Sequence, residues 1–166
     1  FEHYVPYFEH QQFPPDEIFS YARELSIKAR VWPLDRSGVP RSVSELSTAN
    51  FALGAIDEGD SLTAMRRVTS RVAEARVILG GKVTDFSGFV PGVVEEAAET
   101  VALHKPLYVA GGFGGAATLV GRTSQPELYE WLPNDLPAGL TRDVQESTEQ
   151  LLQGELAQDG LSEEER

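Results

Sequence analysis

Residues 75–115 read ARVILGGKVTDFSGFVPGVVEEAAETVALHKPLYVAGGFGG, and this stretch decides the fold. It contains two short apolar runs, Arg76–Leu79 and Pro106–Ala110, and each of them ends in a pair of glycines. Short runs that are rich in β-branched and aromatic residues and bounded by glycine are typical of buried strands. A segment of helical character, Val93–Leu103, lies between them. Strand, helix and strand at this spacing predict a βαβ unit with parallel strands.

The carboxyl ends of the two predicted strands form the candidate site. Gly80–Gly81 follows the first run, and Gly111–Gly112 follows the second. Open parallel sheets bind ligands outside the carboxyl ends of their strands. Main-chain N–H groups at a glycine-rich turn that leads into a helix can hold phosphate or carboxylate. The alternative is a tight turn with close helix–strand packing, which glycine also permits.

Composition limits the classes of protein and site that the chain can represent. With 166 residues and 41% hydrophobic residues, it can bury one core. The absence of cysteine excludes disulfides and thiolate metal sites. The net charge of −12 disfavours a nucleic-acid backbone as partner. No apolar run approaches the roughly 20 residues of a membrane helix, and no signal peptide is visible, so we expect a cytoplasmic protein without a membrane partner.

The remaining sequence predicts a largely helical arrangement around these strands. We expect a helix that opens with Pro15 and Asp16, a strand at 29–34, a loop at 35–47, and a helix at 62–75 capped by Ser61. Residues 49–56 fit either a short helix or a strand. Residues 1–15 resemble a surface turn or a fraying terminus, because three prolines interrupt them. The paired Glu-His motifs in that segment lack further ligands at metal spacing, so no metal site is predicted.

Most of the negative charge belongs to the last forty residues. A helix capped by Thr141 is expected from Arg142 to about residue 156, followed by a frayed acidic end. We therefore predict a nucleotide-binding domain at 1–125 and an acidic helical extension at 126–166.

Several side chains near the glycine pairs could serve a ligand. Lys82 directly follows the first pair, and Arg66 and Arg67 lie on the helix before it; lysine and arginine both suit phosphate. Glu95 and Glu96 occupy the first turn of the next helix, where carboxylates suit the helix dipole, bond a ribose diol or act as an acid–base group. A phenylalanine could stack on a base, the candidates being Phe86, Phe89 and Phe113. Solvated or core positions are the alternative for all of them.

Four segments of the chain are similar in sequence to a known protein family. The segments Val77–Lys82, Phe86–Gly88, Pro91–Ala97 and Pro106–Ala116 resemble the SLOG superfamily, most closely the SLOG domains fused to TIR or nucleoside-phosphorylase-like domains in bacterial antiphage systems. The clear resemblance covers residues 62–120. It implies an α/β fold with a Rossmann-like parallel sheet flanked by helices. SLOG domains usually open with a strand and a phosphate-binding turn, and no such β-α unit is recognisable before Asp16.

The resemblance implies a domain that senses an NAD-derived nucleotide, such as ADP-ribose or a cyclic isomer, and regulates a fused effector. A homo-oligomer and no tightly bound cofactor are expected. The implied ligand-binding residues are Arg66, Arg67, Gly80, Gly81, Lys82, Phe86, Gly88, Gly92, Glu95, Glu96, Gly111, Gly112, Phe113, Gly114 and Gly115.

Two alternatives stay open. The first is a LOG-like N-glycosidase that acts on a nucleotide, with Glu95 or Glu96 as its catalytic group. The LOG motif PGGxGTxxE is altered here in residues 110–118. The motif's proline is absent, Ala116 stands where threonine would follow the glycines, and the closing glutamate of the motif is missing. These departures favour binding without turnover. The second alternative is an oligomerisation scaffold that binds no ligand.

Overall fold

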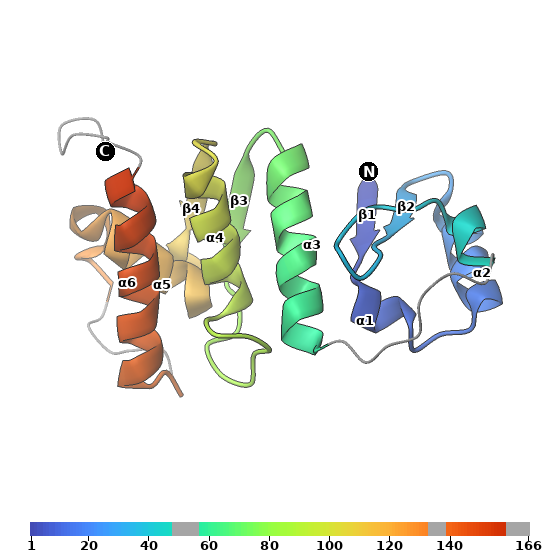
Figure 1. Ribbon diagram of the computed structural model, residues 1–166. Helices are drawn as coiled ribbons and strands as arrows, with labels where there is room; N and C mark the ends of the chain where they lie inside the picture. Colours follow the sequence, from blue (N-terminus) through green and yellow to red (C-terminus); the bar gives the residue numbers. More distant parts are fainter. Residues whose placement is uncertain (48–56, 133–138, 159–166) are drawn as a thin grey trace. The chain divides into compact units, whose positions relative to one another are not determined.

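A computed structural model describes residues 1–47, 57–132 and 139–158, and its secondary structure is mixed α/β (Figure 1). The chain divides into two compact units, residues 1–69 and 70–166. The segment 49–56, which the sequence left undecided between helix and strand, lies outside the described residues. The domain boundary predicted at residue 125 stays a prediction.

The first unit contains a parallel strand pair. Strand β1 (Glu2–Val5) pairs in parallel with β2 (Arg30–Pro33), with Val5 opposite Pro33. The predicted strand at 29–34 is therefore confirmed. The interpretation of residues 1–15 as a turn or fraying terminus is wrong, because β1 forms there. Its sequence signal is weak, since a strand of four residues opens with polar side chains and is followed at once by proline.

Helices connect and follow these strands. The short α1 (Tyr7–His10) follows β1, and α2 (Pro15–Leu25) begins with proline at its first position, where the missing N–H costs nothing. A 3₁₀-helix, η1 (Val43–Ser47), ends the first described segment. The helix α3 (Glu58–Val72) begins four residues earlier than predicted.

The predicted cap of α3 is wrong. The side chain of Asp57 accepts the N–H groups of Gly59 and Asp60 at 2.8 and 3.3 Å. Ser61 instead lies inside the helix, where its buried hydroxyl accepts the N–H of Phe8 at 2.9 Å. Asp57, four residues before Ser61, is therefore the residue that caps the helix.

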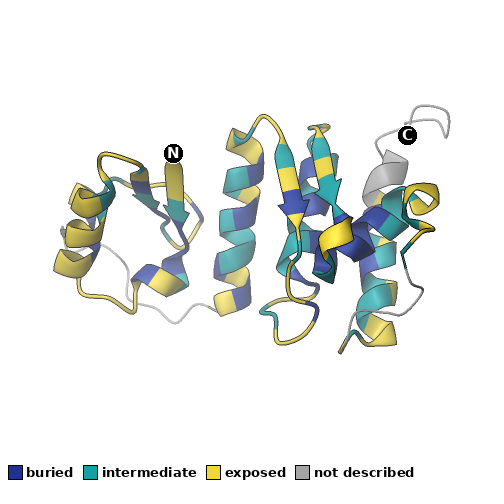
Figure 2. Ribbon diagram, turned by 180° about the vertical axis from the view of Figure 1, so that it is seen from behind, coloured by how far each residue is buried: buried dark blue, intermediate teal, exposed yellow. Residues whose placement is uncertain are grey.

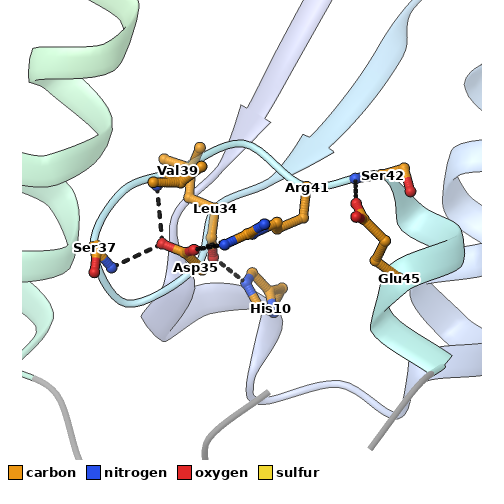
Figure 3. A network of polar contacts seen from close by, with 8 residues as sticks. All are labelled: His10, Leu34, Asp35, Ser37, Val39, Arg41, Ser42 and Glu45. Carbon is orange, nitrogen blue, oxygen red and sulfur yellow. Dashed lines mark hydrogen bonds and ion pairs between the residues drawn. The ribbon is translucent and has the colours of Figure 1, made fainter. Parts of the chain in front are cut away.

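The loop between β2 and η1 is organised around Asp35 (Figure 3). Its carboxylate accepts the N–H groups of Ser37 and Val39, both at 2.9 Å, and pairs with the guanidinium of Arg41 at 2.7 Å. Partial burial alone would raise the pKa of Asp35, but these donors and the positive charge together lower it below its ordinary value.

The second unit confirms the predicted βαβ arrangement. Strands β3 (Arg76–Leu79) and β4 (Leu107–Ala110) pair in parallel, in register from Arg76 opposite Leu107 to Leu79 opposite Ala110. The helix α4 (Gly92–Ala102) connects them. Along β3, buried Ile78 lies between exposed Val77 and Leu79, which appears as alternating colours in Figure 2. One face of this sheet therefore meets the core.

The core of the second unit forms where three helices meet the strands. After β4 come the 3₁₀-helix η2 (Gly111–Phe113), α5 (Gly115–Ser124), the 3₁₀-helix η3 (Pro126–Tyr129) and α6 (Arg142–Gln158). Helices α4, α5 and α6 pack against one another. Their buried side chains meet Ile78, and the most deeply buried are Val94, Ala97, Ala116, Ala117, Val120 and Leu152.

Helix α6 confirms the helix predicted from Arg142. The Thr141 hydroxyl accepts the N–H of Val144 at 3.4 Å, as expected of its cap. No helix among the described residues is long and apolar enough to cross a lipid bilayer.

Candidate functional site

The two glycine turns lie at the same edge of the second sheet. Leu79 is paired with Ala110, so Gly80 and Gly111 leave the sheet side by side at the carboxyl ends of parallel strands. This is the arrangement that the sequence predicted for the turns. It is also the edge at which parallel sheets place their ligands.

Main-chain hydrogen bonds join the two turns. At the start of α5, the N–H groups of Ala116 and Ala117 donate to the carbonyl oxygens of Gly81 and Gly80, at 3.1 and 2.8 Å. Two donors of the first helical turn are therefore engaged within the protein and are not available to a phosphate. This departs from a simple helix-terminus anion site, in which these donors would face the ligand.

Close packing explains three of the candidate glycines. Gly115 has a φ of +68°, and an added Cβ would overlap the main chain of Gly80 and Gly81. Gly81 has a φ of +92°, and its Cβ would lie 2.6 Å from the side chain of Val93. A Cβ on Gly111 would overlap the ring of Tyr129. The alternative interpretation of glycine, as a residue that permits close approach, therefore holds at these positions.

Other glycines of the turns face open space. Gly80 and Gly114 have φ values of +59° and +84°, and no described heavy atom lies within 4 Å of a Cβ built on either. Gly112 is exposed, and so is Lys82. The open surface of the site thus consists of main chain from both turns beside one lysine side chain.

Two aromatic rings stand at this surface. The side chain of Phe113 is 78% exposed, and that of Trp131 is 70% exposed. The Trp131 indole donates to the carbonyl of Leu128 at 2.9 Å, and its ring lies 3.4 Å from the position of a Cβ on Gly112. Because large apolar side chains are costly to leave in water, two exposed rings at a glycine turn suit a flat ligand.

Sequence reasoning missed Trp131 as a site residue. Its position depends on Tyr129, whose hydroxyl donates to the carbonyl of Val109 at 2.9 Å and whose ring packs against Gly111 and Gly121. These contacts bring η3 back over the end of β4. No periodicity or motif links residue 131 to the turn at 111–112, and the only available signal was a tryptophan in a loop.

The structure places Glu96 away from the turns. Its carboxylate pairs with the guanidinium of Arg76 at 2.9 Å. Arg76 also donates to the hydroxyls of Thr100 and Ser70, at 3.1 and 3.0 Å. Arg76 begins β3 whereas Gly80 follows its end, so the two positions are about 13 Å apart along the strand. Glu96 therefore has a structural partner at the opposite end of the strand.

The other candidates occupy varied positions. Glu95 is half-buried on α4, and Gly92 begins that helix. Phe86 is half-buried and Gly88 is exposed, with a φ of +120°, in the loop that precedes the helix. Arg66 and Arg67 belong to α3 within the first unit, where Arg66 is buried and Arg67 exposed. Among the described residues, no group of three or more His, Asp and Glu side chains could hold a metal ion.

The comparisons with known proteins identify the family. The family model described as SLOG cluster2 matches residues 2–162. The chain belongs to the SLOG superfamily. The match extends beyond the segment 62–120 on both sides, and it indicates a nucleotide-related SLOG domain. No curated protein and no solved structure matched the chain.

Proposed function

We propose that this SLOG domain binds a nucleotide at its two glycine turns and senses it as a signal. The ligand class is an NAD-derived nucleotide, such as ADP-ribose or a cyclic isomer. The observation that supports the proposal most is the pairing of Leu79 with Ala110, which brings both turns to one edge of the sheet. The phosphates would lie against the open main chain at Gly80 and Gly114, with Lys82 as the positive charge.

The exposed rings of Phe113 and Trp131 would receive the base. Stacking between a base and an aromatic side chain contributes about 1 to 3 kcal/mol for each base. Trp131 lies beside Gly112, so a base on its indole would keep the phosphates close to the second turn.

Sensing is favoured over hydrolysis by the position of Glu96, one of the two candidate acid–base groups. An N-glycosidase needs an acid–base group at the sugar, but Glu96 is held by Arg76. The altered LOG motif points in the same direction. We therefore assign the output to a fused TIR or nucleosidase-type effector in antiphage defence, controlled through ligand-dependent association of copies of the chain. The resemblance to such SLOG proteins supports this assignment.

Isothermal titration calorimetry of the purified protein with ADP-ribose and its cyclic isomers tests the binding site. Lys82→Ala should weaken binding roughly tenfold or more, because a charge-assisted hydrogen bond contributes about 1.5 to 3 kcal/mol. Trp131→Ala should weaken it at least about fivefold through lost stacking. Phe19→Ala removes an exposed ring on α2 of the first unit, which belongs to neither turn, so it should leave the affinity unchanged.

If no nucleotide binds, or if all three variants bind with the same affinity, the glycine turns are not a nucleotide-binding site. Incubation with NAD and nucleoside monophosphates, followed by chromatography, distinguishes a sensor from an N-glycosidase. A sensor returns the nucleotide intact, whereas release of a free base would establish the N-glycosidase.

A further inference from the structure

The first unit contains a cavity that is separate from the glycine turns. Its volume is about 340 Å³, at the lower end of the range for ligand pockets. Three successive elements supply its walls: β1, α1 with the turn after it, and the first two turns of α2. The lining residues are His3, Val5, Glu9, His10, Phe13, Glu17, Ile18 and Tyr21.

The inner wall of the cavity is fixed by buried groups. Val5 and Ile18 are both at least 90% buried and give an apolar surface. His10 is 2% exposed, and its Nε2–H donates to the carbonyl of Leu34 at 2.7 Å (Figure 3). Its Nδ1 accepts from the side chain of Gln11 at 3.3 Å. Both imidazole nitrogens therefore have protein partners, and the ring serves as a wall of fixed orientation.

The outer wall is aromatic. The Tyr21 hydroxyl and Nδ1 of His3 are 3.1 Å apart, and the two rings meet edge to face with centroids 5.7 Å apart. This contact holds the Tyr21 ring at the cavity mouth. Phe13 is half exposed on the turn before α2. A flat ligand would cover aromatic surface that is otherwise in water.

The charge of the lining is negative. Glu9 and Glu17 contribute carboxylates, and neither lysine nor arginine is among the lining residues. Burial lowers the pKa of His10, an effect larger than the opposing one of its bond to Leu34, so this imidazole is neutral at physiological pH. The wall therefore repels anions and attracts cations, which also favour the faces of aromatic rings.

We propose that this cavity binds a small aromatic cation, a flat ring that carries a protonated amine or amidine. The ring lies between Ile18 and the aromatic wall, and its positive group is directed to Glu9 and Glu17. Such a site would give the domain a second ligand, chemically opposite to a phosphorylated one.

Three isosteric probes test the charge preference. Benzamidine is a cation at neutral pH, benzamide is neutral and benzoate is an anion, while their size and shape are nearly the same. Titrations followed by ¹H–¹⁵N correlation spectra of the folded protein should give a Kd on the order of a millimolar for benzamidine, as expected for a fragment. Benzamide should bind more weakly and benzoate should not bind. The shifted amides should belong to β1, α1 and the start of α2.

A matched pair of variants tests the role of the carboxylate. Glu17 and Asp16 both lie in the first turn of α2, and both stabilise that helix through its dipole, but Asp16 does not line the cavity. Glu17→Gln should weaken benzamidine binding roughly three- to fivefold, the effect of a partly exposed ion pair. Asp16→Asn should leave the Kd unchanged.

Three outcomes would overturn the proposal. These are no saturable shift with benzamidine, equal affinity for benzamidine and benzoate, or equal losses in Glu17→Gln and Asp16→Asn.

Phe13→Ala, a change at a half-exposed position, should also weaken benzamidine binding. An unchanged Kd in that variant would exclude the aromatic wall from the site.

Discussion

At the scale of single residues, the glycines of the two turns divide into two kinds. Gly81 packs closely against the side chain of Val93, and Gly115 packs closely against the main chain of the first turn. Gly80 and Gly114 face open space. The sequence predicted that glycine is needed at these positions, but not which glycines pack and which remain open. That distinction depends on Val93 and on the neighbouring turn, which reach these positions only in the folded chain.

Substitution of Gly115 should reveal its packing role. We expect Gly115→Ala to lower the free energy of unfolding by about 2 to 4 kcal/mol, because its φ of +68° is strained for alanine and the Cβ overlaps the Gly80–Gly81 main chain. Urea denaturation measures the change. Gly154→Ala is the control, since this glycine lies in α6 with open space around it and should gain up to about 1 kcal/mol. Similar effects in both variants would contradict the packing argument.

Glu96 and Trp131 show why side-chain roles escaped the sequence. The pattern placed Glu96 near a helix start, where a ribose contact and a structural role were both plausible. Arg76 decides between them through an ion pair of 2.9 Å that spans 20 positions in sequence. Trp131 reaches the site through the contacts of Tyr129. Both depend on long-range contacts that local spacing does not encode.

At the scale of elements, the clearest sequence patterns predicted the helices and strands correctly. The strands at 76–79 and 107–110 and the helix between them follow from apolar runs and glycine pairs, and their parallel pairing follows from the connection. The strand at 2–5 had no such signal. The helix start at Glu58 was also missed, because Asp57 caps it ahead of Ser61.

Long-range polar contacts then fix how elements meet. The ammonium of Lys105, just before β4, donates to the carbonyl oxygens of Ser70 and Ala73 at 2.8 and 2.7 Å. It thereby satisfies carbonyls at the end of α3, where a positive charge also suits the helix dipole.

Burial of His10, whose bond to the Leu34 carbonyl ties α1 to the end of β2, should make the first unit sensitive to acid, because a protonated imidazole is costly to bury. Burial lowers the pKa of His10 below its ordinary value of 6.5, so the unfolded chain takes up a proton more readily than the folded one. The stability contributed by neutral His10 is therefore complete above about pH 6.5 and is lost as the pH falls towards the folded pKa.

Denaturation at about pH 7.5 and about pH 5.5 tests this linkage. His10→Gln keeps a donor for the Leu34 carbonyl but does not titrate. We expect the wild-type protein to lose more stability than this variant between the two pH values. Equal losses would show that protonation of His10 is not linked to folding.

At the scale of the whole molecule, the family follows from the sequence and its architecture is α/β. The SLOG match covers residues 2–162, although the motifs recognisable by inspection cover only 62–120. Two parallel strand pairs underlie this architecture: β1–β2, connected through α1 and α2, and β3–β4, connected through α4. The glycine turns end the second pair, and the cavity lined by Glu9 and Glu17 is built on the first. Under the two proposals made above, these two places bind small ligands of opposite charge.

The most direct test of the central claim is a titration with ADP-ribose followed by ¹H–¹⁵N correlation spectra. A nucleotide at the shared edge of β3 and β4 should shift the amides of Gly80, Lys82, Gly112 and Gly114, together with the indole N–H of Trp131. The amide of Ala102, at the end of α4 that precedes the start of β4, should stay in place. Saturable shifts confined to residues of the first unit, with the turn amides unmoved, would contradict the account.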